Sequence, residues 1–231
     1  MTTSGTTNFN PSLGELTLHA FNLCGIRPTQ LTQEYMQSAR MATNLMLSSW
    51  SNQGVNLWKV SLVTGNLTTA QSVYTVNSSV IMILDAYVST TQGTTTTDRI
   101  ILPVSRSEYA SYPNKDMQGF PTVFWFDRLI SPTITIWPVP DTSQGPSTYS
   151  YYAVSQIEDA NLTNGQTIEL PYRWMDAFAF GLAHRLSQIW APQITPQRAT
   201  EAKEAYDIAA QQDTENVPIY LSPMIAGYWR N

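Results

Sequence analysis

Two histidines and one cysteine are the side chains of this 231-residue sequence whose types most readily support catalysis or metal binding. His19 and His184 lie in separate predicted helices, and neither has a carboxylate or a cysteine at ligand spacing. A zinc site needs several ligands, and a general base needs groups that orient it. We therefore predict that both are ordinary helix-face residues, not metal ligands or catalytic bases.

Cys24 is the only cysteine, so the chain cannot form an intrachain disulfide, and a cytosolic folding compartment is the simple interpretation. A nucleophilic thiol needs a nearby base or cation that stabilises its thiolate. Arg27 is the only basic neighbour of Cys24, which sits at a predicted helix end in apolar company. We predict a packed thiol.

The carboxylates that could support chemistry are Glu158 and Asp159, which are adjacent, and Asp85, Asp127 and Asp141, which follow strand-like runs. Paired carboxylates can hydrolyse glycosidic bonds, so a glycan hydrolase using Glu158, Asp159 or Asp85 stays open as an alternative. Adjacency in a loop does not make side chains converge, however, and the sequence has no calcium-loop, phosphate-loop or nucleophile-elbow motif. We predict no catalytic residue, no metal and no cofactor, and therefore no enzyme.

Arginines and aromatic residues are the remaining candidates for recognition. Arg106, Arg128 and Arg173 are interface candidates, because arginine is favoured at protein contacts, and surface solubility is the alternative for each. The seven tryptophans and twelve tyrosines could form a glycan- or receptor-binding β module, which is a second alternative. Most tryptophans fall on predicted helix stripes or inside strands, which favours core or interface positions.

The composition favours an assembly subunit over a nucleic-acid-binding protein. Only 13% of residues are charged, as is typical of secreted proteins and of subunits buried in large assemblies. The twelve Lys and Arg residues are scattered and the net charge is −5, so we expect no basic patch that binds DNA tightly. Like charge would instead let nucleic acid slide past. No signal peptide and no apolar run of membrane-spanning length are found in the sequence.

Helical signals begin after a polar N-terminus, residues 1–11, that we expect to be flexible. Ser12 and Glu15 form a capping box for a first helix, which Gly25 ends, and Thr32 caps a second, longer helix. The apolar stripe of this second helix consists of Tyr35, Ala39, Ala42, Met46 and Trp50.

Helical signals return at Pro171, a residue favoured in the first turn of a helix. The third helix has an apolar stripe of Trp174, Phe178, Leu182, Leu186 and Ile189. A fourth helix is predicted from near Pro196 to about Glu215. Residues 12–56 and 171–216 therefore predict an antiparallel bundle of about four helices from both ends of the chain.

Between the helices, residues 57–170 are rich in strand signals. β-branched and aromatic runs predict strands at residues 57–62, 72–76, 80–88, 98–103, 123–126, 133–137 and 147–154. Thr64-Gly65-Asn66 is predicted as a turn, Thr90–Thr97 as an exposed hairpin tip, and Ser105–Tyr112 as a short helix capped by Ser105. The expected fold class is α+β, with an antiparallel β domain inserted into the helical bundle.

The last residues, 217–231, are apolar and broken by prolines, with little helical pattern. Such a terminus is poorly explained by an isolated monomer and suits an extended arm that packs on a neighbour. The candidate contact residues of this C-terminal arm are Ile219, Tyr220, Leu221, Met224, Ile225, Tyr228 and Trp229.

Several short segments, in this order and spacing, resemble a known family. They are Trp50–Trp58, Tyr74–Asn77, Val104–Tyr109, Pro113–Lys115, Gly119–Pro121, Phe126–Arg128, Ile136–Asp141, Pro171–Trp174 and Gly181–Ala183. Together they resemble the head-to-tail adaptors of tailed, notably short-tailed, bacteriophages, also called tail tubular protein A or packaged-DNA stabilisation proteins. The resemblance spans Ser12 to Pro218.

The resemblance implies a virion protein made in the host cytoplasm and placed at the head–tail junction. It implies a homo-oligomeric ring, usually of twelve copies, between the portal protein and a tail nozzle or tube protein, with tail fibres as further partners. The ring would extend the DNA channel, pass DNA without reading its sequence, and help to retain the packaged genome, with no membrane involved. By the same analogy the C-terminal arm would dock on the portal and the β domain would face the tail.

Overall fold

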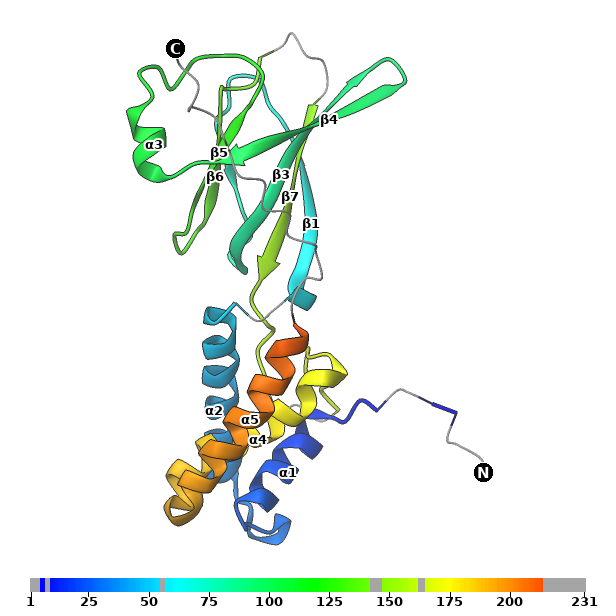
Figure 1. Cartoon of the computed structure of the whole chain (residues 1–231), viewed down its shortest axis with the longest axis vertical. Helices are drawn as coiled ribbons and strands as arrows, with labels where there is room; N and C mark the ends of the chain where they lie inside the picture. The colour runs from blue at the N-terminus through cyan, green and yellow to red at the C-terminus, as the bar shows by residue number, and fades with distance from the viewer. Residues whose placement is uncertain (1–4, 7–8, 55–56, 142–146, 162–164, 214–231) are drawn as a thin grey trace, which may run out of the picture.

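A computed structural model describes residues 5–6, 9–54, 57–141, 147–161 and 165–213. The molecule is elongated, with four helices gathered at one end and a seven-stranded sheet, together with one short helix, at the other (Figure 1). The fold is therefore mixed α+β, as the sequence predicts, and it has five α-helices within the described residues. None of these helices is long and apolar enough to cross a lipid bilayer.

Four of the helices come from the two ends of the chain. They are α1 (Leu13–Leu23), α2 (Gln33–Asn52), α4 (Met175–Trp190) and α5 (Thr195–Gln212). Ser12 and Glu15 form the predicted capping box on α1. Thr32 does occupy the N-cap position of α2, but its side chain makes no capping hydrogen bond. The 3₁₀ turn η3 (Tyr172–Trp174) delays the start of α4 by one turn relative to the prediction.

The helices share one hydrophobic core, in which α4 contacts α1, α2 and α5. Trp174, Phe178, Leu182 and Leu186 are fully buried in it, as the stripe on the third predicted helix requires. Ile189, however, is 57% exposed, so its assignment to that stripe is wrong. It is the last stripe residue of α4, one residue before the helix ends at Trp190.

The seven strands lie where strand signals predict them, with shifted ends. They are β1 (Val60–Asn66), β2 (Val73–Thr75), β3 (Val80–Gln92), β4 (Thr95–Pro103), β5 (Val123–Asp127), β6 (Thr133–Trp137) and β7 (Ser147–Ser155). Their order in the curled sheet is β1-β7-β3-β4-β5-β6-β2. The curl encloses a second core, whose largest fully buried side chains are Val88, Ile101, Phe124, Ile134 and Ile136.

The prediction of an antiparallel sheet is wrong for one pair, because β4 and β5 run parallel at Leu102 and Pro103. Parallel strands need a crossover connection, and residues 104–122 supply it. This crossover contains the predicted short helix, α3 (Arg106–Ser111), whose Glu108 amide donates to the Ser105 hydroxyl. Sequence periodicity reveals strands but not their partners, so it could not reveal this pairing.

Two predicted turn regions belong to strands. Gly65 lies inside β1, and a Cβ atom there would be 2.5 Å from the Tyr149 ring, so glycine makes room for that ring. In the Thr90–Thr97 tract, β3 and β4 stay paired to Gln92 and Thr95, and only Gly93 and Thr94 form the turn. The resulting β-hairpin projects beyond the rest of the sheet (Figure 1).

A small polar cluster lies where the helices and the sheet meet. The Trp58 indole N–H donates to the carbonyl oxygen of Glu169, 3.2 Å away. The Glu169 carboxylate pairs with the Lys59 ammonium at 2.5 Å and accepts the backbone N–H of Glu158 at 3.1 Å. Segments on both connections between the helices and the sheet are thereby tied together.

Candidate interaction surfaces

The two histidines line different surface hollows. His19 on α1 lines one with Phe9 and Tyr172, whereas His184 on α4 lines another. Burial, and then the positive charge of Arg185, lower the pKa of His184 from its ordinary value and so favour the neutral imidazole. In the part of the chain that the structure describes, no cluster of His, Cys, Asp and Glu could hold a metal ion.

The candidate hydrolase carboxylates occupy different parts of the fold. Asp85 is exposed on β3, whereas Glu158 and Asp159 are exposed in the segment that leads from β7 back to the helices. The backbone carbonyl of Asp159 accepts a hydrogen bond from the side-chain amide of Gln166 at 3.1 Å, so Asp159 is tied to a later part of the same segment. Asp127 is the last residue of β5, and Asp141 lies in the connection that follows β6.

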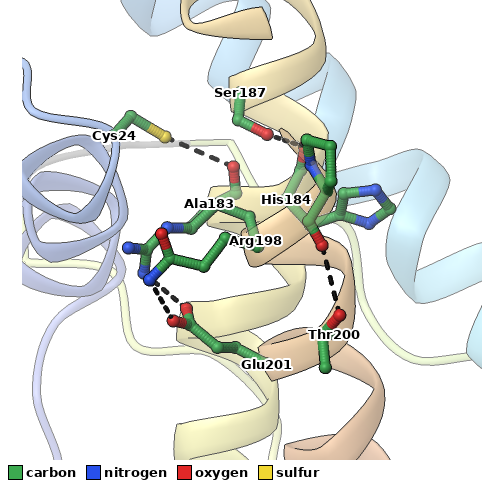
Figure 2. Close-up of polar contacts among 9 residues, drawn as sticks. Cys24, Ala183, His184, Ser187, Arg198, Thr200 and Glu201 are labelled. Atoms are coloured by element: carbon green, nitrogen blue, oxygen red, sulfur yellow. Dashed lines mark hydrogen bonds and ion pairs between the residues drawn. The ribbon is translucent and has the colours of Figure 1, made fainter. Parts of the chain in front are cut away.

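Cys24 is buried at the end of α1, and its thiol donates a hydrogen bond to the carbonyl oxygen of Ala183 at 3.3 Å (Figure 2). Burial raises the pKa of this thiol to about 11, and the charge of Arg198 lowers it only in part. Arg198 is itself held by Glu201 at 2.5 Å, as Figure 2 shows. The prediction of a packed thiol is thus confirmed for this residue.

This environment makes the thiol slow to react. At pH 8 a thiol of pKa about 11 carries roughly a hundredth of the thiolate of one near 9. We expect maleimide labelling of the native protein at pH 8 to be at least about a hundredfold slower than labelling in urea. Because the folded-state pKa is raised, the stability that the protonated thiol contributes is fully present below pH 9 and is lost as pH rises toward 11. Equal labelling rates in the two states would contradict the buried position.

The three interface arginines have different surroundings. Arg106 and Arg128 are exposed, and neither forms an ion pair with another described residue. The Arg173 guanidinium pairs with the buried carboxylate of Asp213 at 2.6 Å and lies 6.0 Å from the centre of the Trp58 ring. Arg173 therefore has an intramolecular task, while the interface role of all three arginines stays a prediction.

The predicted C-terminal contact residues lie outside the described residues. These are Ile219, Tyr220, Leu221, Met224, Ile225, Tyr228 and Trp229.

A groove between α2 and α4 is a candidate interaction surface that the sequence interpretation missed. It measures about 420 Å³, and its apolar lining includes Met41, Leu45 and Ile189, with Arg185 and Gln188 as polar groups. Met41 is 63% exposed. The sequence signal that could have revealed this groove is the spacing of Met41 and Leu45. These two residues lie one helical turn apart and outside the buried stripe of α2. Large exposed apolar side chains grouped in this way are typical of contact surfaces.

A second hollow, of about 470 Å³, lies between the N-terminal segment, α1 and α4. The Phe9 ring meets the Tyr172 ring edge-on at 6.2 Å, and both are exposed. Pro11, Leu16 and Met175 complete its apolar lining. Phe9 and Pro11 thus lie beside the helices, and the flexibility of residues 1–11 stays a prediction.

Apolar side chains are also exposed on the sheet face that points away from the β core. Leu62 lies opposite Tyr152 across β1 and β7, and Ile100 lies opposite Tyr87 across β3 and β4. Leu62, Tyr152, Ile100 and Leu102 are all exposed large hydrophobic residues.

The aromatic residues around β5 and β6 pack on one another. Tyr109 of α3 stacks on Trp125 at 5.5 Å, and Tyr112 meets Trp137 at 4.4 Å. The Lys115 ammonium lies 5.3 Å from the centre of the Tyr109 ring. These contacts attach α3 and its loop to the sheet, so each of these rings has a partner within the chain.

No curated protein matches this chain. A protein-family model, described as the SU10 adaptor protein, matches residues 29–224, from the turn before α2 through both cores and into the last residues. The match begins after α1, later than the resemblance seen in the sequence, and it continues past Pro218 to residue 224. It covers most of the chain, and this protein therefore belongs to the SU10 adaptor protein family, a family of phage head–tail adaptors.

Proposed function

We propose that this protein forms a ring that joins the portal to the tail nozzle or tube of a phage, as adaptors of the tail tubular protein A type do. The ring, of twelve copies, extends the DNA channel and helps to retain the packaged DNA. The observation that carries this proposal is the family match over residues 29–224. The protein is then a structural component of the virion at the head–tail junction, and not an enzyme.

Charge and surface chemistry support this proposal. The net charge of −5 suits a wall past which DNA must move without binding, because phosphates are repelled by it. Apolar side chains exposed on α2, α4 and the outer sheet face need partners that cover them. A ring subunit has two lateral neighbours as well as contacts above and below it.

Each part of the chain has a task in this proposal. Residues 12–56 and 171–216 form an antiparallel helical bundle that carries residues 57–170, the β domain, toward the tail. Residues 217–231 form the arm that docks on the portal. Tail fibres are further partners, and DNA passes through the channel with no sequence-specific contact.

Deleting residues 219–231 is expected to leave the fold intact and to abolish stable docking on the portal. The deleted segment has four aliphatic and three aromatic side chains that would be buried against the portal, and none of the described core residues belongs to it. Co-purification of tagged portal with the full-length and truncated chains measures docking, and circular dichroism checks the fold. Undiminished docking of the truncated chain would remove the arm from the account.

The proposal as a whole is tested by mixing the protein with its portal and recording native mass spectra. A complex of one portal ring with twelve copies is the expected result. A protein that stays monomeric and does not bind portal would contradict the proposed function.

A further inference from the structure

The two strands at the edges of the sheet differ in how they are protected. Edge strands expose unpaired amides, and proteins usually protect them by short length, charged residues or proline. At one edge β2 has only three residues. At the other edge β1 has seven residues, Val60–Asn66, with neither a charge nor a proline among them. Within the part of the chain that the structure describes, β1 is thus an edge with none of these three protections.

β4 provides a second open edge inside the strand order. It pairs with β3 along Thr95–Ile101 on one side, whereas on its other side β5 pairs only with Leu102 and Pro103. Residues 95–100 are all exposed. Threonine, which makes up three of them, favours strands, so this segment is a preformed strand with one side free of any described strand.

The backbone groups at both edges point outward at alternate residues. The Leu67 N–H, just after β1, donates to the carbonyl of Ser147 and so points toward β7. In a regular strand the amides of Leu62, Thr64 and Asn66 then point the opposite way, to the open side. The Leu102 N–H donates to the carbonyl of Thr122 on the β5 side.

By the same alternation, the amides of Thr96, Asp98 and Ile100 point to the same side of β4 as that of Leu102, along the stretch that β5 does not reach. Among the residues that the structure describes, no backbone group outside the sheet accepts hydrogen bonds from these three amides or donates to their carbonyls. Two rows of outward-pointing backbone groups therefore lie at opposite sides of the four strands β1, β7, β3 and β4.

We propose that β1 of one copy pairs with β4 of the next copy and so continues the sheet from subunit to subunit. Each of the three pairings from β1 to β4 is antiparallel, so β4 runs opposite to β1 within one chain. A neighbouring copy in the same orientation therefore presents its β1 antiparallel to this β4. The two edges are different surfaces, so the contact is heterologous, and repeated rotation closes it into a ring.

The faces of the two strands select the register. Leu62 and Ile100 both point away from the β core, and they are 49% and 61% exposed. Residues directly opposite in an antiparallel pair lie on the same face, so Ile100 can face Leu62 of the partner subunit. Asp98 then faces Thr64 of the partner subunit, and Thr96 faces its Asn66. In this register the outward amides of both strands meet, and the two apolar side chains bury each other.

This inference rests on the proposed ring and adds the lateral contact that builds it. A second copy of this chain is the proposed partner at both edges. The open edges of β1 and β4 match each other in length, strand direction, amide orientation and exposed face. A strand from a tail protein added to β1 would leave the β4 edge unexplained.

The test is disulfide trapping of the Leu62→Cys/Ile100→Cys double variant, assembled on portal. Paired residues in this position have Cα atoms about 5.5 Å apart, which a disulfide can span. After mild oxidation, denaturing gels are expected to show a ladder of covalent multimers up to the full ring. The matched control is Ser61→Cys/Ile100→Cys, whose two side chains lie on opposite sheet faces and should form no ladder. The native Cys24 is buried and common to both.

The outcomes separate this inference from the proposed function. Portal-bound rings without a ladder, or with equal ladders in both variants, overturn the β1–β4 contact and leave the adaptor function standing. Failure of the unmodified protein to assemble on portal contradicts the function itself.

A second variant does not depend on cysteine chemistry. Leu62→Lys places a charge opposite Ile100, at a position exposed enough to leave the monomer fold unchanged. We expect an unchanged thermal unfolding temperature and at least a tenfold loss of rings on portal. Rings that form as well as those of the unmodified chain would overturn the inference.

Discussion

Trp174→Ala is expected to lower the free energy of unfolding by about 3–5 kcal/mol, the largest loss from any single change considered for this chain. The Trp174 side chain is fully buried at the start of α4. Its ring lies 5.2 Å from that of Trp50, 5.5 Å from that of Trp58 and 5.5 Å from that of Tyr206. Removing the Trp174 ring opens a cavity between α2, the 3₁₀ turn before β1, and α5. These three elements are packed on other parts of the core, so they cannot all move in to fill the cavity.

Urea unfolding followed by circular dichroism measures this effect. Tyr172→Ala is the matched control, because Tyr172 lies in the same 3₁₀ turn but is exposed, and its loss should stay below about 1 kcal/mol. Trp174→Phe should cost less than alanine, because phenylalanine fills much of the space that alanine leaves empty. Neither change loses a hydrogen bond to a described residue, since the indole N–H makes none there. A cost below about 1 kcal/mol for Trp174→Ala would show that the helical core is not packed as described.

Arg173→Gln is expected to lower the free energy of unfolding by about 2 kcal/mol. The Asp213 carboxylate is buried and has the Arg173 guanidinium as its partner at one oxygen, while its other oxygen has no hydrogen bond to any described residue. Removing the cation leaves a buried charge without compensation. The cost is smaller than for a fully buried pair, because the Arg173 side chain is partly exposed.

The control for this change is the double variant Arg173→Gln/Asp213→Asn. Without the carboxylate, glutamine leaves no buried charge, so the double variant should recover more than half of the lost stability. The same variants examine the interface hypothesis for Arg173. Loss of ring assembly with no loss of monomer stability would place Arg173 at a subunit contact and contradict its intramolecular role.

Local sequence signals predicted the elements of this fold well, because capping and strand signals depend on neighbouring residues. Ser12 and Glu15 cap α1 as expected, and Pro138 follows the last residue of β6. Errors arise where distant packing decides. The sequence predicts Gly65 to be a turn residue, whereas in the fold a side chain at this position would collide with the Tyr149 ring. Tyr149 is distant in the sequence, so local signals could not reveal this contact.

The candidate surfaces were harder to predict than the elements. Catalytic motifs, or their absence, can be recognised in the sequence itself. The location of a contact surface instead depends on which apolar side chains the fold leaves exposed to solvent. Ile189 continues the stripe of α4 and still lies in the groove beside α2. The open edges of β1 and β4 follow from strand order and from the crossover, neither of which is encoded in the period of a single strand.

Electron microscopy of the protein assembled with its portal tests the central claim most directly. The account predicts a ring of twelve copies stacked on the portal, with an open central channel and with the sheets directed away from the portal toward the tail. Single copies scattered on the portal, or a protein absent from the portal complex altogether, would contradict it.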